Sequence, residues 1–168
     1  MYENQGIDWF GMRCQSWCQE EDSLKMWNCY SEKRCAVSIA VDLSDLTNLK
    51  YADKGVEGFF VEYVEEFSIE DMLNKVVGKT GEFYYPNVLK WKQDKFSFEK
   101  EYRIYLSLLD SEGVYCGEEN HRGIEVNIDK EITHFIKRVY CHPESPEEYR
   151  RQVKEYCREK NLVFVDNC

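Results

Sequence analysis

Hydrophobic and polar residues alternate along several short stretches of the chain, as is typical of strands with one buried face. Stretches of this kind, rich in branched and aromatic residues, lie at residues 13–18, 35–43, 58–66, 99–108, 123–128 and 135–141. Near the C-terminus, LVFVD at residues 162–166 is almost continuously apolar, which indicates a strand buried on both faces. The pattern therefore predicts a protein built around a β-sheet.

Helical signals separate these strands. Asp22 or Ser23 can cap a short helix in SLKMWNCYSE, because the side-chain oxygen of either residue can accept from a first-turn amide. Ser68 and Asp71 resemble a capping arrangement that opens an amphipathic helix, which ends near Gly78. The clearest start is at residues 145–148, where a serine, a proline and two glutamates precede a predicted helix at 146–160.

Strands and helices mix without strict strand–helix–strand alternation, so the expected class is α+β. We predict a single domain over residues 1–168, with a mixed, largely antiparallel sheet, a few short helices and a covering C-terminal helix. Strand 99–108 is expected to be central, and helix 146–160 to cover one face of its sheet. The glycine-rich segments 78–87 and 110–123 are expected to be connections.

The chain carries 22 Lys and Arg against 32 Asp and Glu, a net charge of -10. This charge repels phosphate backbones and disfavours general nucleic-acid binding. It fits either a solvated surface or an acidic face that docks on a basic protein partner. The chain has no apolar run near the roughly 20 residues of a membrane span and no signal segment at its start, so we expect a cytoplasmic protein without a membrane association.

Eight cysteines in a chain of this kind indicate reduced thiols rather than a disulfide framework. No C-x-x-C pair occurs, so we expect no metal site. Cys141 and His142 could form a nucleophile and base, but neighbours on a strand point to opposite faces.

Two motifs and a closing segment suggest a family. SWCQEEDSLKMWNCY places Ser16 and Trp17 before an acidic stretch and Met26, Trp27 and Tyr30 after it, and the second motif combines Lys92 with Phe96, Glu99, Glu101 and Arg103. With residues 138–165, these motifs resemble the domain-of-unknown-function family 2971 of bacteria and their phages, from about residue 13 onward. The family's usual N-terminal segment has no counterpart here, and Cys35 or Ala36 stands where a glycine is common.

The resemblance implies a fold and candidate positions but no reaction. It also implies a bacterial or phage origin, and we expect a short accessory protein in the conflict between phage and host.

On the predicted strand 99–108, Glu99, Glu101 and Arg103 share one face. Enclosed carboxylates need partners, so Arg103 and Lys92 are expected to neutralise them. Two interpretations stay open: a purely structural ion-pair ladder, or a cleft in which Glu101 and Glu99 are catalytic. In the second, Lys92, Arg103, Ser16 and the aromatic residues Trp17, Trp27 and Tyr30 bind a nucleotide-like molecule. Trp27 and Tyr30, at helical spacing, could equally be core residues.

Function therefore divides into two classes. The first is an acidic interaction module that acts by blocking a basic protein partner. The alternative is a small-ligand or nucleotide-binding domain, and Ser16 with the Glu-x-Glu pair resembles ADP-ribosyltransferases, in which a glutamate orients the ribose. The sequence names no cofactor and does not establish that the protein is an enzyme.

Overall fold

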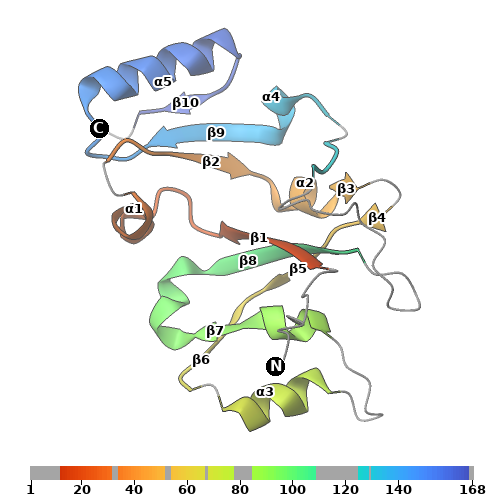
Figure 1. Ribbon diagram of the computed structural model, residues 1–168. Helices are drawn as coiled ribbons and strands as arrows, with labels where there is room; N and C mark the ends of the chain where they lie inside the picture. The colour runs from red at the N-terminus through yellow and green to blue at the C-terminus, as the bar shows by residue number, and fades with distance from the viewer. Residues whose placement is uncertain are drawn as a thin grey trace, which may run out of the picture.

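The computed structural model describes residues 12–31, 34–51, 54–66, 68–77, 85–108, 125–128 and 130–166. These residues form a single α+β domain with several small, mostly antiparallel sheets and few short helices (Figure 1). The predicted class and the C-terminal helix are confirmed. The predicted sheet is divided into smaller sheets, because individual strands change partners along the chain.

The first sheet has the order β1-β8-β5 and contains β1 (Met12–Cys18), β8 (Glu101–Ser107) and β5 (Glu57–Phe60), all antiparallel. The expectation that the strand near residues 99–108 is central is confirmed, because β8 pairs on both edges. The strand begins at Glu101, after Lys100 takes the left-handed backbone conformation (φ 42°). Residues 94–99 form the 3₁₀ helix η2 (Asp94–Glu99), so Glu99 lies on a different element from Glu101.

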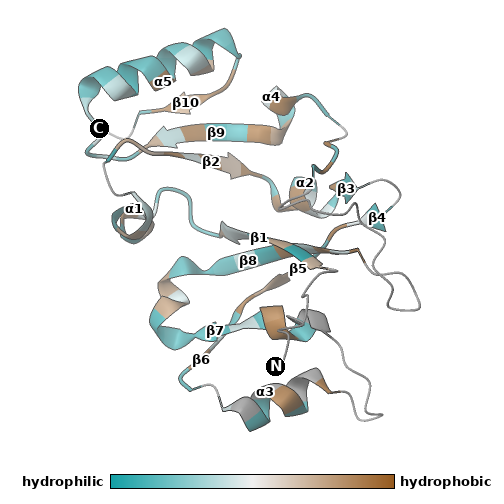
Figure 2. Ribbon diagram, viewed as in Figure 1, coloured by the Kyte–Doolittle hydropathy of each residue, from teal (hydrophilic) through white to brown (hydrophobic). Residues whose placement is uncertain are grey.

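The second sheet has the order β10-β9-β2 and contains β10 (Phe164–Val165), β9 (Ile136–Cys141) and β2 (Val37–Val41). Helix α5 (Glu147–Glu159) packs on β9 and β10, not on the sheet built around β8. Pro146 is its N-cap, and the Ser145 hydroxyl donates to the Arg34 carbonyl instead of capping it. The prediction of a strand buried on both faces is wrong: β10 is shorter than predicted, and both of its residues are only partly buried. Figure 2 shows α5 as mostly hydrophilic, as expected for a helix with one packed face.

The predicted strand 58–66 is broken at Val61, which donates its N–H to the carbonyl of Glu101. After that residue the chain leaves β8, and β6 (Glu62–Val64) pairs in parallel with β7 (Trp91–Gln93). Two further strands, β3 (Lys50–Tyr51) and β4 (Lys54–Gly55), pair antiparallel. A strand was predicted over residues 123–128. Its described residues form only an isolated antiparallel bridge, between Asn127 and Lys50.

Short helices connect the sheets: α1 (Leu24–Tyr30), α2 (Leu43–Thr47), α3 (Ile69–Val76), α4 (Ile132–Phe135) and the 3₁₀ helix η1 (Tyr85–Lys90). Ser68 caps α3 as predicted, accepting from the Asp71 amide. The side chain of Ser23 makes no cap bond to α1. Gly78, residues 79–84 and the predicted connection 110–123 lie outside the described residues.

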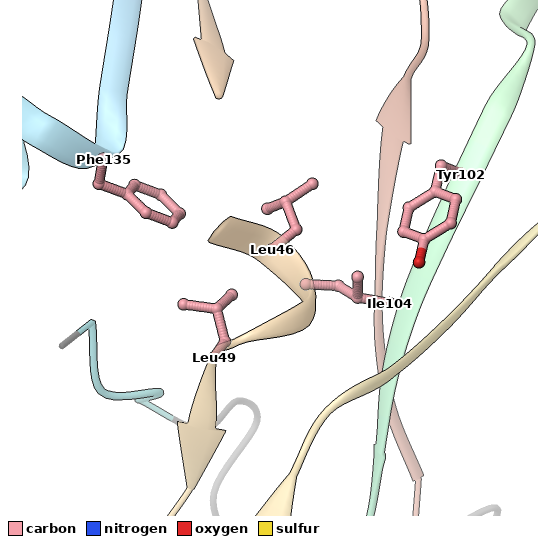
Figure 3. Close-up of a cluster of buried hydrophobic side chains, with 5 residues drawn as sticks. All are labelled: Leu46, Leu49, Tyr102, Ile104 and Phe135. Atoms are coloured by element: carbon pink, nitrogen blue, oxygen red, sulfur yellow. The ribbon is translucent and has the colours of Figure 1, made fainter. Parts of the chain in front are cut away.

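The core lies between the two sheets (Figure 3). Leu46 and Leu49 from the α2 region meet Tyr102 and Ile104 from β8 and Phe135 from α4. All five are at least nine-tenths buried. Burial of such side chains stabilises a fold by roughly 1.5–3 kcal/mol each, so this cluster joins the two sheets. Among the helices in the described ranges, none is long and apolar enough to cross a membrane.

Candidate functional site

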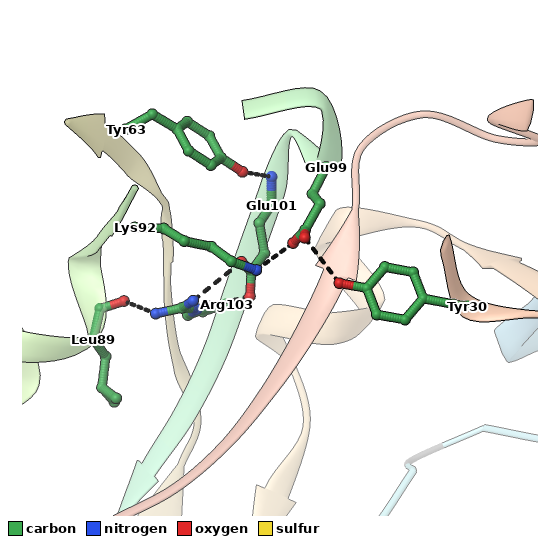
Figure 4. Close-up of polar contacts among 7 residues, drawn as sticks. All are labelled: Tyr30, Tyr63, Leu89, Lys92, Glu99, Glu101 and Arg103. Atoms are coloured by element: carbon green, nitrogen blue, oxygen red, sulfur yellow. Dashed lines mark hydrogen bonds and ion pairs between the residues drawn. The ribbon is translucent and has the colours of Figure 1, made fainter. Parts of the chain in front are cut away.

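Four charged side chains from three elements meet on one face of the first sheet (Figure 4). Arg103 and Glu101 come from β8, Lys92 from β7 and Glu99 from the end of η2. The Arg103 guanidinium grips Glu101 with two bonds, Nε to Oε1 at 2.7 Å and Nη2 to Oε2 at 3.1 Å. Lys92 Nζ donates to Glu99 and, at 3.2 Å, to Oε2 of Glu101. We call Lys92, Glu99, Glu101 and Arg103 the ion-pair network.

Neutral groups complete the network's hydrogen bonding. The Tyr30 hydroxyl donates to Glu99 at 2.8 Å, and the Tyr63 hydroxyl accepts from the Glu101 amide at 2.8 Å. Arg103 Nη1 donates to the carbonyl of Leu89, and the Ser16 hydroxyl bonds to the Glu101 carboxylate. The network therefore ties β8 to β1, β6, β7, η1 and α1.

The electrostatics of the network favour its charged form. Burial raises the pKa of Glu101, but the bonds from Arg103, Ser16 and Lys92 outweigh it and leave that pKa below its usual value. Burial likewise lowers the pKa of Lys92, and the bonds to Glu99 and Glu101 reverse the effect and raise it. Glu99 and Glu101 are only 4% and 3% exposed. Burial also lowers the pKa of Arg103, but the bond to Glu101 outweighs it and leaves that pKa raised, so Glu101 and the two cations favour one another's charged forms.

The geometry of the ion-pair network is unfavourable for catalysis. A general acid or nucleophile must reach substrate, yet both carboxylates are enclosed and already bonded to cations. The geometry favours the interpretation of a structural ion-pair ladder. The ADP-ribosyltransferase hypothesis stays a prediction, and the burial of Glu101 is the observation that weighs against it.

A groove of about 540 Å³ opens elsewhere, between β1, α1 and β2. Three aromatic residues in cross-strand register form a row along it: Trp17 on β1 opposite Tyr102 on β8, and Tyr102 opposite Phe60 on β5. Phe60 and Tyr102 pack edge to face with centroids 4.9 Å apart. Because side chains alternate along β8, this row and Arg103 lie on opposite faces of the sheet. We call this site the aromatic groove.

The wall of the aromatic groove is acidic. Among the described residues that line it are Glu20, Glu21 and Asp22, and no lysine, arginine or histidine. Glu21 accepts from Arg138 and Tyr140 at the rim, and these bonds lower the pKa of its carboxyl. Glu20 is likewise paired with Lys100, so two of the three carboxylates already have a cation at the rim, and the described lining residues offer no unpaired cation to a phosphate group.

Two residues that line the groove each carry a buried polar atom without a partner in the described part of the chain. The indole nitrogen of Trp17 and the hydroxyl of Ser31 are buried and make no hydrogen bond within the described part of the chain. Only four side-chain atoms of the described residues share this condition, so half of them line one groove. Leaving a buried polar group unsatisfied costs about 1–3 kcal/mol, and such groups call for an explanation.

The structure separates the predicted site residues into two places. Lys92, Glu99, Glu101 and Arg103 meet as predicted, with Ser16 and Tyr30 joining them. Trp17 and Trp27 line the aromatic groove instead, and Ser16 and Tyr30 contribute to both sites. Trp27 is 7% exposed, donates to Asp22 at 2.7 Å and packs on His142, so it serves mainly as a core residue.

Sequence reasoning missed Phe60, Tyr102 and the edge of β2. Only the register of β1, β8 and β5 aligns Tyr102 and Phe60 with Trp17. The available signal was the alternation of Tyr102 with Glu101 and Arg103; Phe60, between Phe59 and Val61, has no such signal. In the described ranges the cysteines at 14, 18, 29, 35, 141 and 157 are free thiols, and no group of three metal-ligating side chains occurs.

No protein-family model, curated protein or solved structure matches this chain. The resemblance to family 2971 and the expected role in phage–host conflict therefore stay predictions. The two sites identified above come from the geometry of this chain alone.

Proposed function

We propose that the protein is a binding module that recognises a protein partner through the aromatic groove. The observation that supports this most directly is the composition of the groove wall, which combines aromatic and aliphatic side chains with three carboxylates and no cation among the described lining residues. Its volume lies within the roughly 300–1,000 Å³ typical of ligand sites.

The same observation weighs against a nucleotide. Recognition of phosphate relies on arginine, lysine or exposed backbone amides. The two cations predicted for that purpose, Lys92 and Arg103, have side chains that are 23% and 15% exposed and are held by Glu99 and Glu101. Redirecting either cation to a ligand would leave a buried carboxylate unpaired, which is strongly unfavourable.

The partner is expected to present apolar side chains and positive charge. Aromatic side chains such as Phe60, which is 53% exposed, are typical anchors of protein interfaces. The net charge of -10 speeds the encounter with a basic segment and makes the association weaken as salt rises. This is the interaction-module class expected from the sequence, now assigned to a particular surface.

The proposal can be tested with random peptides of about twelve residues, displayed on phage and selected on the protein. Selected peptides are then titrated by fluorescence polarisation against the wild type, Phe60→Ala and Tyr156→Ala. Tyr156 is a matched control, because it is an equally exposed aromatic residue (57%) on α5, outside the groove. Phe60→Ala should weaken binding at least about tenfold, whereas Tyr156→Ala should leave it unchanged.

Equal binding by the wild type and Phe60→Ala would remove the groove as the recognition surface. The same titrations with ATP and NAD⁺ address the alternative class. Binding or turnover of either nucleotide that disappears in Glu101→Gln would overturn the proposal in favour of a nucleotide-binding domain.

A further inference from the structure

We infer that the partner segment binds as an added β-strand along the outer edge of β2. This inference rests on the proposed function and specifies how the groove is used. In the described part of the chain β2 is the last strand of its sheet, and residues 36–41 line the aromatic groove. An unpaired strand edge presents a row of backbone donors and acceptors to an extended peptide.

The hydrogen bonds of β9 show which backbone groups of β2 face outward. The carbonyl of Ala36 accepts from the His142 amide, and the Val139 amide donates to Val163 on the far side of β9. In an antiparallel ladder the bonded pairs alternate, so Ser38 and Ala40 turn their amides toward β9. Val37 and Ile39 therefore turn their N–H and C=O groups toward the open edge.

The apolar side chains at this edge are also only partly buried. Val37 and Ile39 are 47% and 41% exposed, although both are apolar and lie on a regular strand. A strand paired with β2 would place alternate side chains beside them, and such cross-strand pairs stabilise a sheet by about 0.2–1 kcal/mol each. The remaining side chains of the added strand would point toward the aromatic row of Trp17, Tyr102 and Phe60.

A peptide also suits the unsatisfied atoms of the groove. Both atoms are buried beneath the groove surface, so an occupant reaches them only after the Trp17 or Ser31 side chain turns outward. Backbone carbonyls are then acceptors for the Trp17 indole N–H, and a peptide supplies both donors and acceptors for the Ser31 hydroxyl. A purely apolar occupant, such as a lipid chain, would leave both groups unpaired. The occupant is therefore expected to carry polar backbone groups together with apolar side chains.

The charge of the rim specifies one end of the segment. Glu20 and Glu21 lie where β1 leads into α1, at one end of the groove, and their side chains are 45% and 44% exposed. Glu20 is paired with Lys100 and Glu21 with Arg138, so a lysine or arginine of the segment would share these exposed carboxylates with the protein's own cations, whereas a phosphorylated or acidic segment gains nothing from them. The predicted ligand is a short extended segment of β-branched residues with a basic residue at one end.

The first test uses a synthetic peptide of about eight residues, in which valine alternates with threonine and lysine occupies each end. Two derivatives carry N-methyl groups on alternate amides, one set in each of the two registers. Strand pairing requires only one register of amides, so one derivative should bind about tenfold or more weakly and the other like the parent. Equal binding by the two derivatives would overturn strand addition.

The second test changes the protein at one position. Ile39→Pro and Ile39→Ala both shorten the side chain, but only proline removes the outward N–H. The amide of Ile39 does not face β9, so both variants should keep the fold, as checked by circular dichroism. Proline should weaken peptide binding about fivefold beyond alanine. The same affinity for both variants would contradict the inference.

The outcomes separate this inference from the proposed function. If display-selected peptides bind in a Phe60-dependent way but tolerate N-methylation in both registers, the groove is a protein-binding site of another geometry. If no peptide binds in a Phe60-dependent way, both statements fail. A dimer of the free protein that Ile39→Pro dissociates and Ile39→Ala does not would assign the edge to a second copy of this chain and overturn the separate partner.

Discussion

The two faces of the first sheet differ in how completely their side chains are satisfied. On one face, the ion-pair network encloses Glu101 and gives its carboxylate partners on Arg103, Lys92 and Ser16. On the other, Phe60 is half-exposed and the Trp17 indole nitrogen has no acceptor among the described residues. The same strand, β8, supplies residues to both faces through the two-residue alternation of its side chains.

This difference indicates a division of roles. Buried, fully paired charges specify how elements pack, since any other arrangement leaves a charge without a partner. The exposed Phe60 ring and the orphaned polar atoms of Trp17 and Ser31 gain partners only when something else binds. We therefore propose that the motif most prominent in the sequence serves architecture and that the groove on the opposite face is the recognition surface.

The largest effect is expected when a charge is removed from the ion-pair network, which tests whether that face of the sheet stabilises the fold. Glu101→Ala leaves Arg103 without its bidentate partner and Lys92 with one carboxylate, so we expect a loss of about 3–5 kcal/mol in the free energy of unfolding. Urea denaturation followed by circular dichroism measures it. Glu159→Ala, an exposed position on α5, is the control and should change stability by less than about 0.5 kcal/mol. A loss below about 1 kcal/mol for Glu101→Ala would mean that the network is not structural.

A second substitution, at Gly58, tests how the Tyr102 ring packs on the groove face of the sheet. A Cβ at Gly58 would lie 2.1 Å from the Tyr102 hydroxyl and 2.6 Å from its ring, so the ring lies across β5 only because residue 58 is glycine. Gly58→Ala should destabilise the protein by about 1–3 kcal/mol through this clash. In a Tyr102→Leu background the same change should cost less. An equal cost in both backgrounds, measured by denaturation, would show that the ring is not the obstacle.

Much of this architecture could be predicted from local sequence. The alternation in β1 and β9, the cap at Ser68 and the C-terminal helix all depend on neighbouring residues. Which strands pair with each other could not be predicted in this way. The sequence predicts one continuous strand over residues 58–66, yet the chain moves from β8 to β7 at Val61, a change set by tertiary pairing.

The candidate site shows the same limit. Pairing of Lys92 and Arg103 with the glutamates followed from the high cost of burying unpaired charge, which holds for any fold. The groove depends instead on two edge strands of different sheets lying near each other. Exposure of Val37 and Ile39 is a property of that assembly, because their alternation alone is the same as that of a covered strand.

Lowering the pH should weaken the ion-pair network without a substitution, because it protonates Glu101. The pKa of Glu101 is lowered in the folded protein, so its contribution to stability is present above the unfolded value of about 4.3 and is lost as the pH falls through the folded value. The stability difference between the wild type and Glu101→Gln should therefore be large at neutral pH and shrink in acid, below about pH 4. Denaturant titrations at several pH values measure this difference. A difference independent of pH would show that the charge of Glu101 contributes nothing.

The smallest expected effect comes from two serines that differ only in their surroundings. Ser16 bonds to Glu101, so Ser16→Ala should lower the free energy of unfolding by about 1 kcal/mol. Ser31 has a buried hydroxyl without a partner in the described residues, so Ser31→Ala should leave stability unchanged or raise it by up to about 1 kcal/mol. Thermal unfolding of both variants beside the wild type provides the comparison.

Ser31→Ala should be neutral or favourable for the stability of the free protein but unfavourable for binding of a peptide in the groove. If an added strand bonds to the Ser31 hydroxyl, removing that hydroxyl weakens binding by the worth of one hydrogen bond, about fivefold, while the free protein is no less stable. A purely structural position would move stability and leave affinity unchanged. Ser31→Ala that loses stability to the same degree as Ser16→Ala would show that its hydroxyl is already satisfied, and the groove would lose one of its two unsatisfied groups.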